Sequence, residues 1–434
     1  MEITMGVLRY LLPTVAAAVA VSSFGFAQTP DMERDTEALK EYTKQKRSVS
    51  VSEKGGDLSL SGDVRFEYQN VTETADGVSQ RGSGTVDPSN TLFGKANHQF
   101  DVEVNLMIDY RAEDTWASVK LEFDNNSGDT TTLSNGTTLG SGGESGIHLQ
   151  RAFAGYNVFE EDTARFDVEV GRRKLYDLFT SKVQFGGTMD GAVLKYANSL
   201  EGVGDFSATG GTWIVDDRVD QFAWAMEAGL SDITDTGLYA KYSYIDWDST
   251  GVDRWGNRPG TGSGNGMGRW WQSRNSQVML GYKVEPEVLN VDVNLYSGYL
   301  VNHAAKKLIK TNNKKKNKAW FLGARFGKIE YAGDWSLDLS WQSVGAQAVL
   351  DQEVAGIGRG NTAKNHFTDS LDGANADTAK NGAANYKGYS AEALFALTDN
   401  WTVAMEYESS NAADQKIGGR NAYHKLELET VYSF

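Results

Sequence analysis

Residues 423–434 read YHKLELETVYSF and end the chain on an alternation of apolar and polar side chains. In an extended strand successive side chains point to opposite faces. One face therefore carries Leu426, Leu428, Thr430, Tyr432 and Phe434, and the other carries Lys425, Glu427, Glu429 and Ser433. Chain ends in water are usually exposed and poorly ordered. An apolar face that runs to the last residue must be covered, either by the core of a β-sandwich or by lipid.

The same period of two recurs along most of the chain after residue 56. In HQFDVEVNLMIDYR (98–111), Phe100 and Val102 share one face, and Asp101 and Glu103 share the other. We count about 16 such segments, and their phase is ambiguous in 147–159 and 203–215. This count predicts an all-β fold. Because a sandwich core cannot bury so many charges, the charged face favours a water-filled lumen and the apolar face favours lipid.

Connection lengths alternate between these strands. Short turns are expected at 111–114, 160–163, 198–203, 232–235, 285–287, 332–334 and 398–400. Long connections are expected at 70–96, 125–146, 174–188, 249–273, 300–317, 347–384 and 410–421, with 216–218 as one short connection among them. Membrane barrels segregate short periplasmic turns from long outer loops in this way. We therefore expect a transmembrane antiparallel up-and-down β-barrel over residues 55–434.

Composition narrows the function classes. The 434 residues include 47 glycines, 5 prolines and no cysteine, with a net charge of −16. An acidic chain disfavours nucleic acid as a partner, and the absence of cysteine excludes disulfides and thiolate metal sites. The five histidines form no ligand spacing, and no Ser/His/Asp grouping stands out. We expect no cofactor, no metal and no catalysis.

The N-terminal region differs from the rest of the chain. LLPTVAAAVAV (11–21) followed by SSFGFA (22–27) predicts a signal peptide over 1–27 and hence export, with a buried helix as the alternative. Residues 28–54 place acidic residues early and basic residues late, as the helix dipole favours. We interpret 28–54 as a short periplasmic helical segment, with a solvated leader as the alternative.

The C-terminal strand resembles the terminal signature of Gram-negative outer-membrane proteins, through Phe434, Tyr432, Leu428 and Leu426. The whole chain after residue 27 resembles a 16-stranded general porin. A looser resemblance is to the porin-like proteins of chlamydia-type bacteria. It rests on ERDTEALKEYTKQKR (33–47) before SGDVRFEYQN (61–70), and on GRRKLYDLFTSKVQFGG (171–187) before MDGAVLKYAN (189–198). These resemblances imply an outer-membrane channel, assembled as a homotrimer, in contact with lipid and lipopolysaccharide.

The porin resemblance also implies that the third outer loop, 174–187, folds into the lumen and narrows it, whereas an outward surface loop is the alternative. The constriction would be formed by Lys174, Tyr176, Asp177, Lys182 and Gln184. Asp177 is the only acid in this loop, which departs from the strongly acidic loop of typical porins.

Charged residues on the expected inner faces would line the pore. They include Arg65, Asp101, Glu103, Arg111, Lys120, Glu122, Asp167, Glu169, Arg173 and Arg325. Over all expected strands the acids outnumber the bases roughly two to one, and carboxylates on a narrow wall attract cations. The sequence thus predicts a modest cation preference, unless the wall charges pair with one another. The basic loop 303–318 is solvated, binds lipopolysaccharide phosphates or draws anions to the mouth of the pore.

Two functions remain open from the sequence. The first is passive diffusion of small hydrophilic solutes and ions through the outer membrane. The alternative is a barrel that acts mainly as an adhesin or structural surface antigen, with its function in the long loops 70–96 and 347–384.

Overall fold

The computed structural model describes residues 49–53, 56–79, 81, 97–124, 131–132, 138–139, 146–216, 221–247, 273–286, 291–305, 307, 313–350, 353–358 and 384–434. The signal peptide expected over 1–27 and the helix expected before residue 49 lie outside this part. At the end of the 28–54 segment, Val49–Glu53 form strand β1, which pairs antiparallel with the start of β2.

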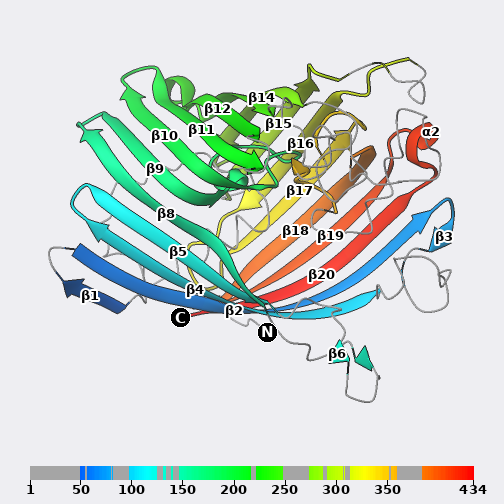
Figure 1. Cartoon of the computed structure of the whole chain (residues 1–434), viewed down its shortest axis with the longest axis horizontal. Helices are drawn as coiled ribbons and strands as arrows, with labels where there is room; N and C mark the ends of the chain where they lie inside the picture. Colours follow the sequence, from blue (N-terminus) through cyan, green and yellow to red (C-terminus); the bar gives the residue numbers. More distant parts are fainter. Residues whose placement is uncertain are drawn as a thin grey trace, which may run out of the picture.

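One antiparallel sheet of 18 strands contains β1, the short strand β3 (Val78–Ser79) and the 16 strands of a closed barrel (Figure 1). Each barrel strand pairs with the next along the chain. The barrel strands are β2 (Gly56–Ala75), β4 (His98–Ala112), β5 (Thr115–Asp124), β8 (Gly146–Glu160), β9 (Ala164–Lys174), β10 (Thr188–Leu200), β11 (Gly204–Asp216), β12 (Gln221–Ser231), β13 (Leu238–Trp247), β14 (Arg274–Val284), β15 (Val293–Asn302), β16 (Lys318–Gly327), β17 (Trp335–Val344), β18 (Tyr386–Thr398), β19 (Trp401–Ala412) and β20 (Ala422–Ser433). The expected fold class and strand number are confirmed.

The last strand closes the barrel against the first. β20 pairs antiparallel with β2, with Tyr432 opposite Val64. The final residue continues this pairing, because Phe434 N–H donates to the Gly62 carbonyl at 2.9 Å and Gly62 N–H donates to the Phe434 carbonyl at 3.0 Å. Closure leaves no open sheet edge, so the backbone groups of the strands bond to one another, as hydrocarbon requires.

Side chains on the two faces of the barrel differ as the alternation predicts. Leu428, Tyr432 and Phe434 are 45%, 41% and 49% exposed on the outer surface, whereas Glu427 and Glu429 face inward and are buried. Two outward aromatic rings, those of Trp401 and Tyr432, lie 5.9 Å apart near the C-terminus. In β20 the apolar side chains therefore point outward and the carboxylates are enclosed.

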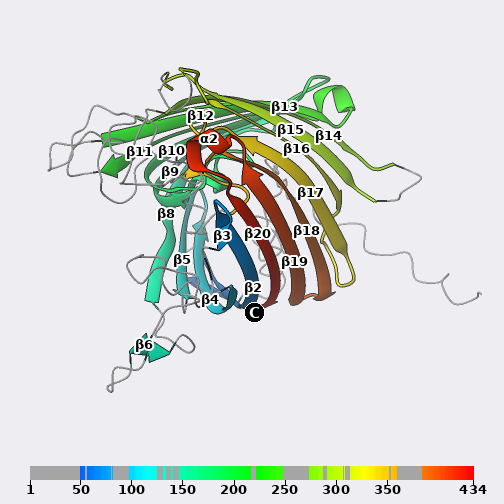
Figure 2. The same ribbon diagram turned by 90° about the vertical axis from the view of Figure 1, so that its right-hand side faces the viewer.

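The connections follow the expected alternation. Short turns such as 113–114, 161–163 and 399–400 lie at the end of the barrel that carries the C-terminus. The strand ends that the long connections join lie at the other end, where the four-residue helix α2 (Gln415–Gly418) joins β19 to β20 (Figure 2). The connection between β11 and β12 is short, as the sequence indicated. Among the described residues, no helix has the length and apolarity needed to cross a bilayer.

Short elements complete the described chain. The 3-10 helix η1 (Leu175–Asp177) follows β9, and η2 (Ile233–Asp235) follows β12. Strands β6 (Thr131–Thr132) and β7 (Thr138–Leu139) form a separate two-stranded sheet.

Candidate functional site

Part of the barrel interior is filled by the segment that connects β9 to β10, residues 174–187. Its apolar side chains Leu175, Phe179, Val183 and Phe185 are all at most 1% exposed. They pack in two apolar clusters with inward-facing side chains of the wall, among them Trp213 of β11. Since burial of apolar area is the main favourable term in packing, this composition accounts for the inward position of the segment.

Polar contacts fix the middle of the segment to three neighbouring strands. Thr180 N–H donates to Glu227 of β12 at 2.8 Å, and its hydroxyl accepts from Lys241 of β13 at 2.8 Å. Gln277 of β14 donates to the Thr180 carbonyl at 2.7 Å and accepts from the Ser181 hydroxyl at 2.7 Å. These contacts satisfy buried backbone groups, which would otherwise cost free energy.

Lys182 and Gln184 of the expected constriction face the wall. The Lys182 ammonium lies 3.7 Å from the Asp338 carboxylate of β17 and 5.7 Å from the centroid of the Tyr296 ring. The Gln184 side chain accepts a hydrogen bond from Asn275 at 3.1 Å. Both residues are more than nine-tenths buried, so in this structure they hold the segment in place.

The other three expected constriction residues lie where the segment begins. Lys174 ends β9, and its ammonium lies 5.5 Å from the centroid of the Tyr176 ring. Tyr176 is 4% exposed within η1. Asp177, the only acid of the segment, ends η1 and is exposed to solvent. Among the five expected constriction residues, Asp177 is therefore the one with an exposed side chain.

A second inward segment follows β17. Residues 345–350 and 353–358, the described parts of segment 345–358, are almost completely buried, including Val349 and Ile357 at 0% exposure. Residues from 347 onward were expected in a long outer connection; the connection is long, but its described residues fold inward. The apolar composition of AQAVL (346–350) and VAGI (354–357) is the overlooked signal for packing inside the barrel.

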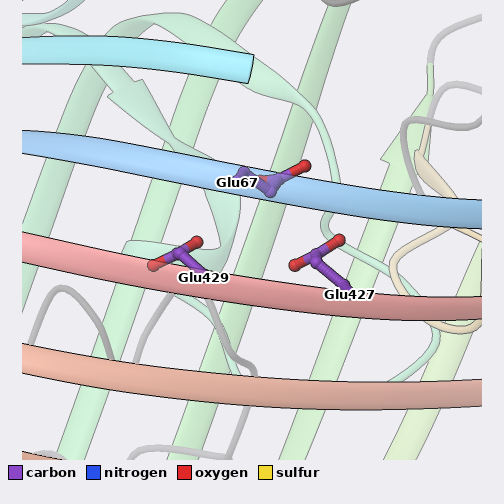
Figure 3. A group of neighbouring side chains, drawn as sticks. All are labelled: Glu67, Glu427 and Glu429. Carbon is purple, nitrogen blue, oxygen red and sulfur yellow. The ribbon is translucent and has the colours of Figure 1, made fainter. Parts of the chain in front are cut away.

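The expected wall residues of β2 and β4 form an ion network with β20. Arg65 lies 3.6 Å from Glu103 and 3.3 Å from Glu429. Glu67 projects beside Glu427 and Glu429, and their nearest carboxylate oxygens lie within 4.8 Å of one another (Figure 3).

Other side chains compensate this carboxylate group. Gln69 donates to Glu427 at 2.9 Å, and Lys425 lies 2.9 Å from the same carboxylate. The group of three carboxylates was missed, although the closure of the last strand against the first would have indicated it.

A second ion network lies on β8–β10. Glu169 pairs with Arg173 and lies 2.9 Å from Lys195. Asp167 lies 2.9 Å from Arg165 and accepts from an asparagine of β8 at 2.8 Å. In this part of the wall, acids and bases neutralise one another.

The remaining expected wall residues occupy inward-facing positions in the strand register. They are Asp101 and Arg111 of β4, Lys120 and Glu122 of β5, and Arg325 of β16. Arg111 is exposed near a short turn, whereas Lys120 is 8% exposed. The structure thus distributes the expected residues around the wall.

A lateral row of carboxylates was also missed. Asp338, Glu392, Glu406 and Glu427 come from β17, β18, β19 and β20, and the register places each directly opposite the next. Like charges directly opposite each other destabilise a sheet. Compensation comes from Lys425, which pairs with Glu406 and Glu427, and from Lys182 and Arg325, which face Asp338 and Glu392. The row leaves this side of the wall rich in acid.

No family model and no curated protein matches the sequence. Among solved structures, the chain is similar to OprB of Pseudomonas putida at high pH, with 11% identity, a TM-score of 0.47, and coverage of 87% of this chain and 94% of OprB. It is also similar to OmpF of Salmonella typhi in complex with daunomycin, with 15% identity, a TM-score of 0.46, and coverage of 89% and 100%. A third is the outer-membrane channel DcaP of Acinetobacter baumannii, with 13% identity, a TM-score of 0.44, and coverage of 88% and 99%. At these identities the similarity concerns the fold, and the function of the barrel interior has to be inferred from the residues of this chain.

Proposed function

We propose that the chain is a passive channel of the Gram-negative outer membrane for small hydrophilic solutes and ions. The supporting observation is the distribution of side chains in a closed barrel, with apolar residues outward and charged residues inward. An apolar outer band suits the hydrocarbon of a bilayer, and a charged inner wall suits water. Passage through such a channel needs no energy source. Export by the expected signal peptide 1–27 belongs to this proposal.

The channel prefers cations modestly. Support comes from the row of carboxylates from Asp338 to Glu427 and from the group of Glu67, Glu427 and Glu429. A narrow wall of low dielectric focuses the field of such charges. Pairing with Lys425 and other bases keeps the preference small, and salt weakens it further because the Debye length is about 8 Å at physiological ionic strength.

Reversal potentials across planar bilayers in a salt gradient test this function. Wild-type protein should carry a steady current with a cation-selective reversal potential. Asp177→Asn should shift that potential toward anions, since it removes the exposed acid of segment 174–187. Glu161→Gln is the matched control, because Glu161 is exposed in a short turn and the shift should be absent. An anion-selective wild type would contradict the proposed preference.

Absence of current from correctly folded protein would contradict the channel itself. That outcome is the one that the adhesin or surface-antigen alternative predicts. The assembly proposed with the channel is a homotrimer surrounded by outer-membrane lipid and lipopolysaccharide. Crosslinking in outer membranes tests the trimer, and a monomer-only pattern would contradict it.

A further inference from the structure

The two inward segments pair with each other through their backbones. Gly186 N–H donates to the Glu353 carbonyl at 3.1 Å, and Ala355 N–H donates to the Val183 carbonyl at 3.1 Å. All three of Val183, Glu353 and Ala355 are more than nine-tenths buried. Residues 183–186 and 353–355 therefore lie side by side inside the barrel.

The fit between the segments leaves no room for larger residues. A Cβ atom on Gly186 would lie 2.7 Å from the Val354 carbonyl oxygen. A Cβ atom on Gly356 would lie 2.8 Å from the Lys182 carbonyl oxygen and would also overlap the side chains of Gln342 and Tyr386. Distances below 3 Å force a displacement, so both glycines are needed for this close approach.

The start of segment 345–358 is anchored to the wall. Gln347 N–H donates to the Lys316 carbonyl at 2.8 Å, and Asn302 of β15 donates to the Gln347 carbonyl at 2.8 Å.

The far end is anchored to other strands. Ile357 N–H donates to Gln342 of β17 at 3.2 Å, and Gly358 N–H donates to Glu408 of β19 at 3.1 Å. The segment is thus held by strands on both sides of its contact with segment 174–187.

We propose that residues 345–350 and 353–358 form the second half of the constriction: they clamp segment 174–187 in the lumen and so set the size of the opening. Segment 174–187 is attached on its own to β12–β14 and β17, while the clamp adds the attachment to β19. This inference rests on the proposed channel function. In this proposal, the two inward segments together determine which sizes of solute can pass through the channel.

The first test uses the absence of cysteine from the chain. Gln184→Cys introduces a single thiol at a position that is 2% exposed. Gly356→Val in the same protein should displace the clamp and release the thiol to a water-soluble maleimide. If release raises an open state from about 1% to about 10% of molecules, labelling accelerates about tenfold. Gly210→Val is the matched control, because nothing lies within 4 Å of a Cβ atom at Gly210.

The second test measures the opening. Gly356→Val should raise single-channel conductance and admit larger sugars into proteoliposomes, and Gly210→Val should change neither. Heat-modifiable gel mobility identifies folded protein. If Gly356→Val does not fold, Gly186→Ala is used instead, because its Cβ atom would disturb the contact between the two segments from the side of 174–187.

The outcomes separate the two proposals. Unchanged labelling in a folded clamp variant overturns the clamp. Faster labelling with unchanged conductance and sugar uptake overturns its control of the opening. A wild type without current contradicts the channel function, whereas labelling still decides whether the clamp exists.

Discussion

Replacing Lys182 tests how segment 174–187 is held. The ammonium lies 3.7 Å from Asp338, and the two side chains are only 9% and 4% exposed. At an effective dielectric constant of about 20, this separation corresponds to an attraction of about 4.5 kcal/mol. Breaking a buried pair by removing one partner typically costs about 3–5 kcal/mol, because the other charge stays buried. Since Arg325 also lies near Asp338, we expect Lys182→Met to cost about 3 kcal/mol.

Urea unfolding in phospholipid vesicles, followed by tryptophan fluorescence, measures this loss. Lys328→Met is the matched control, because Lys328 and Asp292 are 58% and 36% exposed and such pairs contribute about 0–1 kcal/mol. The double variant Lys182→Met/Asp338→Asn should recover more than half of the loss, since it leaves no unpaired charge. If Lys182→Met costs no more than Lys328→Met, the ion pair does not anchor the segment and the reasoning fails.

Two other replacements have distinct expected results. Burial would raise the pKa of Asp414, but hydrogen bonds from Lys316 and from the backbone of α2 outweigh it and hold the pKa below its usual value. The stabilisation is therefore present above the unfolded pKa, about 3.9, and is lost as pH falls through the folded pKa. Hydrogen exchange of 413–421 should be faster in Asp414→Asn at pH 7 and equal to wild type near pH 2; a difference that persists at pH 2 would contradict this. Arg65→Met should leave Glu103 and Glu429 without their shared cation. We expect the free energy of unfolding to fall by about 3–5 kcal/mol and the preference for cations to become stronger. Unchanged ion selectivity would show that these two carboxylates lie off the ion path.

The barrel could be predicted from the sequence because the alternation of apolar and polar side chains is a local property of each strand. The apolar face that ends at Phe434 indicated a last strand covered by a sandwich core or by lipid, and the charged opposite faces favoured lipid. The phase of 147–159 could not be assigned, because a bulge shifts the register between Lys120 and Leu121 opposite β8. One extra residue moves every later side chain to the other face.

The interior was harder to predict, because it depends on register and on loops that fold inward. Placing Glu392 opposite Glu406 needs the pairing of β18 with β19, which strand patterns alone do not fix. Lys182 was assigned to the constriction by its position in a loop, whereas its side chain faces Asp338. Residues 347–384 were assigned to a long outer connection, and the apolar composition of 346–350 and 354–357 was not weighed.

Spin labels placed one at a time at residues 425–430 test the central claim most directly. The chain has no cysteine of its own, so each label reports a single position in membrane-reconstituted protein. Labels at Leu426, Leu428 and Thr430 should relax with oxygen dissolved in lipid, and labels at 425, 427 and 429 with an aqueous nickel chelate. Nickel contact at the even positions, or no period of two, would contradict a barrel that faces lipid outside and water inside.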